Sequence, residues 1–390
     1  MKYKISVRLR SLVVGGWVIA ISSFSSMAAA QSRTGVDIDT LGPQIGENVP
    51  QFELPDQNGK LQSLESILGP NGAMLLFHRS ADWCPYCKAQ LVELQDRLEE
   101  LQSAGIGVAA ISYDSEDTLF KFAERRGITF PLLSDDDSVV ITDFGILNTI
   151  VAEGLGARAD DPDVTADVHR FVAAEVFDSP GLRRMINGTP FPGTLMLDAN
   201  GVVTSRYFEE FYRERVTTSS VMLKEGIALT PIAAIEGTSA QLSFTAYPSN
   251  PIVTNGSRFS IAIDVVPNEN MHVYAPGAEE KGYRVIGLNM APSDYVNFEG
   301  VEFPESEIYH FKPLDEYVPV YQRPFTILQE AIVATSADKE EELRDISALT
   351  LSGTLDYQAC DDAICYLPMS VPVTFTLEFD HLDYERAAAR

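Results

Sequence analysis

The pentapeptide Trp83-Cys84-Pro85-Tyr86-Cys87 stands between an apolar run at residues 73–78 and a leucine-rich segment at residues 85–103. The run, AMLLFH, is typical of a buried strand. The segment has leucines at spacings that place them on one face of a helix, namely Leu91, Leu94, Leu98 and Leu101. The pentapeptide is therefore predicted to connect a strand to the first turn of a helix, where a proline is well tolerated.

Further patterns of the same kind surround this unit. They predict a strand, a helix and the two strands of a hairpin, at residues 107–113, 116–126, 195–198 and 202–207. Together the elements predict an α/β domain over residues 46–225, with helices on both sides of a mixed central sheet. Residues 149–188 have a weaker pattern and are interpreted as an insertion, either passive or a lid over the site.

Beyond residue 239 the hydrophobic pattern changes to a period of two. Apolar residues alternate with polar ones at residues 259–265, 349–357 and 371–379. Such alternation, with turn residues between the runs, predicts an all-β sandwich domain over residues 239–382. Residues 226–238 are then the linker between the two domains.

The chain begins with the pattern of a cleavable secretory signal. Residues 1–30 have a basic start, an apolar core and a small-residue end at Ala28-Ala29-Ala30. An uncleaved anchor is the alternative, but the apolar core is shorter than the roughly 20 residues that a spanning helix needs. Residues 31–45 are then an N-terminal extension of the mature chain. We expect an exported protein without stable membrane insertion once the signal is cleaved. The net charge of −27 argues against nucleic acid as a partner.

Cys84 and Cys87 are the first candidate redox pair. Free N–H groups and the helix dipole favour an anion at a helix start and lower the pKa of a thiol there. We therefore expect Cys84 to be the nucleophile and Cys87 to resolve a mixed disulfide, with Trp83, Pro85 and Tyr86 as supporting residues. Half of a zinc site and an inert structural disulfide are the alternatives.

Cys360 and Cys365 are the second candidate pair, and they lie between two alternating strands. Asp361 and Asp362 follow Cys360, and nearby carboxylates disfavour a thiolate. The pair is interpreted as a disulfide that another thiol attacks or as a dithiol relay. A purely structural disulfide is the alternative. A copper site at His272 is not favoured, because no cluster of ligands surrounds it. No metal or cofactor is expected.

Two more motifs give the first domain a family resemblance. Residues 46–56 (GENVPQFELPD) and 189–194 (TPFPGT), together with the pentapeptide, resemble the peroxiredoxin-like AhpC/TSA branch of the thioredoxin superfamily. The resemblance implies a cis peptide bond at Pro192, preceded by Phe191, that faces the cysteines. Peroxiredoxins have Thr or Ser three residues before the reactive cysteine, where this chain has Ala81. This departure favours disulfide exchange over peroxide reduction.

The second domain resembles the N-terminal periplasmic domain of the DsbD family of transmembrane reductant transporters. The matching segments are residues 271–277 (MHVYAPG) and 357–368 (YQACDDAICYLP). The resemblance implies an immunoglobulin-like sandwich in which Cys360 and Cys365 accept electrons and pass them to periplasmic partners.

These patterns together predict a periplasmic thiol–disulfide oxidoreductase. Its expected partners are protein thiols and disulfides and a DsbD-like membrane reductant. Because the two pairs share one chain, we expect them to exchange electrons with each other or with one common membrane partner. The alternatives are a thiol peroxidase that uses Cys84 and a non-enzymatic binding or scaffold protein with two structural disulfides.

Overall fold

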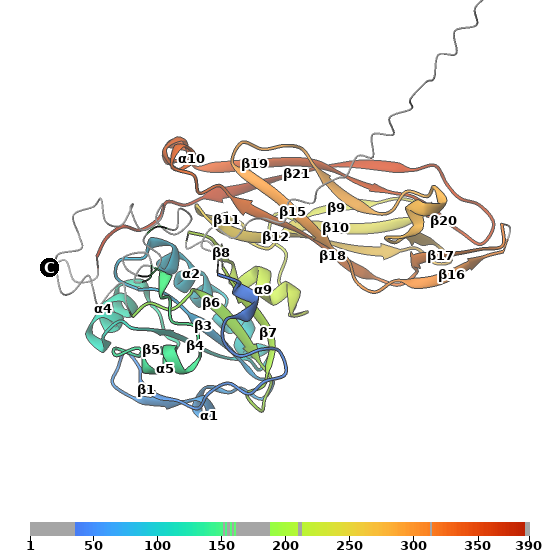
Figure 1. Cartoon of the computed structure of the whole chain (residues 1–390). Coiled ribbons are helices and arrows are strands. Elements are labelled where there is room, and N and C mark those ends of the chain that lie inside the picture. The colour runs from blue at the N-terminus through green and yellow to red at the C-terminus, as the bar shows by residue number, and fades with distance from the viewer. Residues whose placement is uncertain are drawn as a thin grey trace, which may run out of the picture.

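A computed structural model of the chain describes residues 36–150, 153, 157, 160, 188–209, 213–312 and 314–386. The predicted signal peptide and most of the predicted insertion at residues 149–188 lie outside the described residues. Figure 1 shows an α/β domain, blue to green, beside a domain of long strands, yellow to red. In the part of the chain described, no helix has the length and apolar character needed to cross a bilayer.

The first domain is built on a five-stranded sheet with the order β5-β4-β3-β6-β7. Strand β3 pairs parallel with β4 and antiparallel with β6, so the sheet is mixed, as predicted. Two apolar clusters, one on each face, bury every residue of β3 and β6. The predicted thioredoxin-like α/β architecture is confirmed. The strands are β1 (Glu53–Pro55), β2 (Leu61–Ser63), β3 (Ala73–Phe77), β4 (Gly107–Ser112), β5 (Leu132–Ser134), β6 (Gly193–Leu197) and β7 (Val203–Phe208).

The described helices of this domain cover the sheet, and one departs from the prediction. They are η1 (Ile38–Thr40), α1 (Leu64–Ile67), α2 (Pro85–Asp96), α3 (Leu98–Ser103), α4 (Glu116–Arg126), α5 (Val139–Asp143) and α9 (Thr218–Lys224). The single helix predicted over residues 85–103 is broken at Arg97, whose backbone φ and ψ are −100° and 2°. The Arg97 side chain bonds Ser219 of α9 at 2.9 Å, and the four leucines on either side of the break all stay buried.

The second domain consists of strands, as predicted. They are β9 (Ile235–Thr238), β10 (Leu242–Pro248), β11 (Ile252–Val253), β12 (Ser257–Pro267), β13 (His272–Tyr274), β14 (Gly287–Met290), β15 (Val296–Glu302), β16 (Glu307–Phe311), β17 (Glu316–Tyr321), β18 (Phe325–Val333), β19 (Ala348–Tyr357), β20 (Ala359–Cys360) and β21 (Met369–Phe379). Short helices η3 (Ala278–Lys281), α10 (Ala337–Glu342) and η4 (Leu343–Asp345) connect some of them. Sheets β15-β18-β12-β10-β9 and β11-β21-β19-β14 enclose one apolar core, while β16-β17-β13-β20 form a further sheet. Strand β9 lies within the segment predicted as linker.

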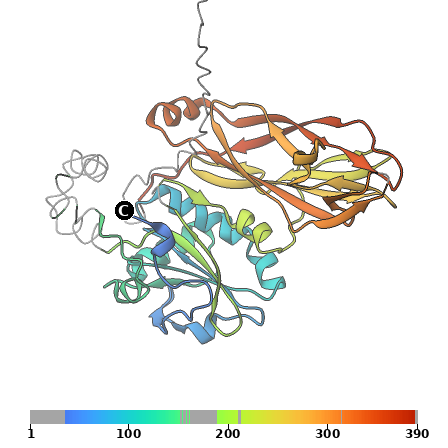
Figure 2. The same ribbon diagram turned by 45° about the vertical axis from the view of Figure 1, so that its right-hand side comes forward.

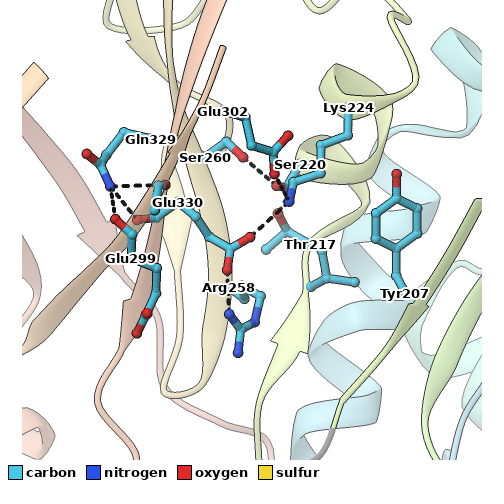
Figure 3. Close-up of polar contacts among 12 residues, drawn as sticks. Tyr207, Thr217, Ser220, Lys224, Arg258, Ser260, Glu299, Glu302, Gln329 and Glu330 are labelled. Carbon is cyan, nitrogen blue, oxygen red and sulfur yellow. Dashed lines mark hydrogen bonds and ion pairs between the residues drawn. The ribbon is translucent and has the colours of Figure 1, made fainter. Parts of the chain in front are cut away.

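The two domains share a strand pairing and an ionic cluster. Strand β8 (Arg215–Val216), just before α9, pairs parallel with the start of β12. Figure 3 shows Lys224 of α9 between two carboxylates of the second domain, 2.7 Å from Glu302 and 2.9 Å from Glu330. Arg258 of β12 pairs with Glu330 and, at 2.9 Å, with Glu214. These contacts hold the start of β12 against the first domain.

Candidate functional site

Cys84 and Cys87 lie at the start of α2, directly after β3 and a connecting loop, as the sequence predicts. Cys84 is the N-cap residue, and its Sγ accepts a hydrogen bond from the backbone N–H of Cys87 at 3.3 Å. Pro85 occupies the first turn, where a missing N–H leaves no helical bond unmade. Both thiols are free, and the exposed fractions are 1% for Cys84 and 0% for Cys87.

The guanidinium of Arg215 contacts both sulfurs. Its terminal nitrogen lies 3.3 Å from the Sγ of Cys87 and 3.7 Å from the Sγ of Cys84. Arg215 is buried in β8, at the point where the first domain pairs with β12. A buried cation at this place favours a thiolate. Sequence reasoning missed Arg215, because nothing in its local pattern distinguishes it from a surface arginine.

The charges around the pair place the thiolate on Cys87. Burial raises the pKa of the Cys84 thiol, and the hydrogen bond with Cys87 raises it further. Burial also opposes ionisation of Cys87, but the hydrogen bond from Cys84 and the guanidinium of Arg215 outweigh it and hold the pKa of Cys87 well below its usual value. The structure thus differs from the prediction that the helix start lowers the pKa of Cys84. The reason is that the pair is fully desolvated and Arg215 lies closer to Cys87.

His78 directly follows β3, lies near Cys87 and stays neutral. Burial lowers its pKa to about 4. Both ring nitrogens are buried and have no hydrogen-bond partner within the part of the chain that the structure describes. His78 therefore adds no positive charge beside Cys87 at neutral pH, and Arg215 supplies the cation.

A buried carboxylate fixes the loop that leads to Cys84. Asp114, just after β4, accepts hydrogen bonds from the backbone N–H of Ala81 at 2.6 Å and from the hydroxyl of Ser80 at 2.8 Å. Burial raises the pKa of Asp114 to about 6. Trp83 donates its indole N–H to the hydroxyl of Tyr113 at 2.6 Å, which anchors the same loop. These bonds set the direction in which the chain enters α2.

The predicted supporting residues are only partly brought to the pair. Tyr86 packs with the cysteines, and its hydroxyl donates to Glu340 of α10 at 2.5 Å. Phe191 packs in a different apolar cluster, with Ile150. The described residues contain no cis peptide bond, which corrects the expectation at Pro192. The segment is held instead by a hydrogen bond from the Phe191 N–H to a backbone carbonyl, 2.7 Å away, in the loop after α5.

Access to the pair is narrow. A cavity of about 480 Å³ lies beside α2, and Tyr86, Lys88 and Arg215 are among its lining residues. Leu382, from the segment after β21, is buried in the same apolar cluster as both cysteines. A small molecule can therefore approach Arg215, whereas the sulfurs themselves are covered.

Cys360 and Cys365 form a disulfide at the tip of the second domain. The hydroxyl of Tyr274 lies 2.9 Å from the Sγ of Cys360 and 3.2 Å from the Sγ of Cys365. Cys360 is buried opposite His272 of β13, whereas Cys365 is half-buried in the loop after β20. Asp361 accepts backbone N–H bonds within that loop, which lower the pKa of its carboxyl. His272 and Tyr274 frame the disulfide, and no cluster of metal-ligating side chains occurs among the residues described.

The two cysteine pairs lie at opposite ends of the second domain's long axis. Arg215, which contacts the first pair, is in register with Ser257 at the start of β12. The end of β12 lies ten residues further on, about 33 Å away at the usual strand rise. The chain then continues to His272, the strand partner of Cys360. Figure 1 likewise shows β20 far from α2. The expected direct exchange between the two pairs does not fit this arrangement.

Comparisons with known proteins concern the first domain. A family model described as AhpC/TSA family matches residues 45–206. Peroxiredoxin Bcp of Escherichia coli (strain K12) is 37% identical over 103 residues, which are 26% of this chain and 65% of that protein. The match thus spans less than two thirds of that relative.

A Coxiella burnetii protein named "putative peroxiredoxin bcp" is 30% identical over 104 residues, which are 27% of this chain and 68% of that protein. Among solved structures, peroxidoxin BcpB from Mycobacterium tuberculosis is 23% identical, with a TM-score of 0.32, over 44% of this chain and 88% of that one. The resemblance of the second domain to DsbD stays a prediction. Through the domain that contains Cys84 and Cys87, the chain belongs to the AhpC/TSA family.

Proposed function

We propose that the protein is a thiol peroxidase in which the Cys84–Cys87 pair reduces a peroxide. The observation that carries this proposal is the buried pair with the Arg215 guanidinium on both sulfurs. The cavity lined by Arg215 admits a small peroxide, whereas a folded protein does not reach sulfurs that are 1% exposed or less. Relatives named peroxiredoxin support the same assignment.

The reaction uses both thiols of the pair. A thiolate attacks one peroxide oxygen, the O–O bond breaks, and the departing oxygen takes up a proton. The attacking sulfur becomes a sulfenic acid, and the second thiol displaces water from it to form the Cys84–Cys87 disulfide. An external dithiol then returns two electrons. Since Ala81 carries no hydroxyl, the guanidinium of Arg215 is the group that stabilises the departing oxygen.

Stoichiometric oxidation tests the proposal. Reduced protein is mixed with one equivalent of hydrogen peroxide, and remaining thiols and remaining peroxide are counted over time. We expect one disulfide per peroxide consumed in the wild type. Cys84→Ser keeps the Cys87 thiolate and so ends as a sulfenic acid trapped by dimedone, whereas Cys87→Ser keeps only the Cys84 thiol, whose pKa is raised, and should react far more slowly. Oxidation no faster than that of a free cysteine would refute the proposal.

Disulfide exchange is the second candidate, and the second cysteine pair favours it. Ile364 and Leu367 are 57% and 84% exposed beside the Cys360–Cys365 disulfide, which gives a partner protein an apolar contact. In this reading the chain is exported to the periplasm, and a DsbD-like membrane protein reduces one pair. Reduction of a protein disulfide substrate by the wild type, lost in a Cys360→Ser/Cys365→Ser variant, would support it. Unchanged reduction in that variant would assign the second disulfide to a structural role.

A further inference from the structure

The segment after β21 crosses the candidate site. Residues 380–386 leave the second domain, adopt neither helix nor strand, and contact α4, the start of α2 and the loop before Cys84. Figures 1 and 2 show the red segment that follows β21 reaching the first domain. We call residues 380–386 the C-terminal strap.

Acidic groups of the strap rest on basic residues of the first domain. Asp383 pairs with Arg126, with Arg125 at 3.3 Å and with Lys88 at 3.5 Å. The ammonium of Lys88 also donates to the backbone carbonyl of Glu385 at 2.7 Å. Lys88 is only 1% exposed, because the strap covers it. The first domain therefore carries a basic groove whose charge the strap satisfies.

An apolar contact lies at the centre of the same groove. Leu382 is 8% exposed and belongs to one apolar cluster with Cys84, Tyr86 and Cys87. At the end of the strap, Arg386 pairs with Asp82, 2.6 Å away, in the loop before Cys84. The strap thus places an aliphatic side chain in the apolar cluster that contains both cysteines, and the ion pairs of Asp383 and Arg386 hold it there.

These contacts define the kind of ligand that the groove accepts. The strap residues that make these contacts are, in chain order, one aliphatic, two acidic and one basic residue (Leu382, Asp383, Glu385 and Arg386), and they are held by side chains and one carbonyl rather than by a strand ladder. A second polypeptide of the same character can make the same contacts once the strap leaves. Disulfide exchange also requires that a partner's sulfur reach the pair, which the strap prevents.

We propose that the groove beneath the C-terminal strap is the docking site for an extended acidic segment of the protein dithiol that reduces the oxidised pair. The strap occupies this site until the partner displaces it. The proposal rests on the proposed function, because it concerns the return of electrons after peroxide reduction. A partner thiolate attacks the Cys84–Cys87 disulfide, a mixed disulfide forms, and the partner's second thiol releases the reduced pair while the partner becomes a disulfide.

Three variants test the strap. One ends after Asp380, one carries Asp383→Lys, and one carries Glu378→Lys, which makes the same charge change at an exposed position of β21. Alkylation of the reduced pair by a bulky maleimide should accelerate roughly 10- to 100-fold in the truncated chain, because a buried leucine and a cluster of ion pairs are lost. Asp383→Lys should give a smaller acceleration, and Glu378→Lys should match the wild type.

A synthetic peptide of residues 379–386 tests the groove itself. It should bind the truncated chain and restore protection from the maleimide, and a peptide with lysine in place of Asp383 should not. Unchanged alkylation in a truncated chain with a wild-type circular dichroism spectrum, or protection by both peptides alike, would overturn the proposal. Oxidation by hydrogen peroxide is measured in parallel. If it is slow while the strap variants respond as expected, the peroxidase assignment fails and the docking groove stands.

Discussion

Arg215→Met removes the guanidinium that contacts both sulfurs and keeps an unbranched side chain in the buried space. Two opposite charges 4 Å apart attract by about 4 kcal/mol at an effective dielectric constant of 20. One pKa unit corresponds to about 1.4 kcal/mol, so the full interaction is worth about 3 units. The guanidinium charge is spread over three nitrogens and the site can relax. We therefore expect the pKa of the Cys87 thiolate to rise by about 2 units.

The assay is the pH dependence of thiol alkylation by iodoacetamide in the reduced protein. A rise of about 2 units slows the reaction of the thiolate at neutral pH by up to about 100-fold, and peroxide oxidation should slow in parallel. Arg215→Lys retains a positive charge and should shift the midpoint less. The reasoning is refuted if Arg215→Met folds, as judged by circular dichroism, and its alkylation midpoint equals that of the wild type.

Three further predictions concern stability and the second disulfide. Lys224→Met should lower the free energy of unfolding by roughly 1–3 kcal/mol, against less than about 0.5 kcal/mol for the exposed Lys121→Met; equal losses in urea denaturation would contradict the role of the domain interface. Burial raises the pKa of Asp114 from 3.8 to about 6, so the folded state binds more protons and this group's contribution to stability falls as the pH rises between these values. Asp114→Asn should therefore flatten the dependence of the free energy of unfolding on pH in this range, and an unchanged slope would show that Asp114 is not its source. Tyr274→Phe removes a hydrogen bond to both sulfurs of the second disulfide and should slow its reduction by dithiothreitol up to about tenfold; a wild-type rate would show that the hydroxyl does not assist.

Local patterns predicted the elements that depend on local physics. The apolar run at residues 73–78 forms strand β3 up to Phe77, and residues 116–126 form α4 with the predicted bounds, ending at Gly127 in the left-handed region. Cys84 is the N-cap residue because Pro85, which is well tolerated in the first turn of a helix, follows it directly. In each case the signal and the structure that it causes lie in the same segment.

The rest of the site depends on contacts between distant residues. Arg215 and Cys84 are separated by 131 positions, and Lys88 and Glu385 by 297. Arg215 and Leu382 each lie in segments with ordinary local sequences, so their roles follow only from the pairing of β8 with β12 and the path of the strap. The pKa order of the two thiols depends on the same contacts.

The second domain therefore contributes to the first domain's site directly. It pairs β12 with the strand that carries Arg215, supplies Glu340 to the hydroxyl of Tyr86, and extends the strap over the sulfurs. A domain that served only to carry electrons would have to bring its own cysteines near Cys84. Its disulfide instead lies beside β13, which follows the far end of β12, about 33 Å from Ser257 at the usual strand rise. The arrangement thus explains the fusion without an internal relay: the second domain positions the cation and covers the first pair with the strap, and its own disulfide lies at the far tip.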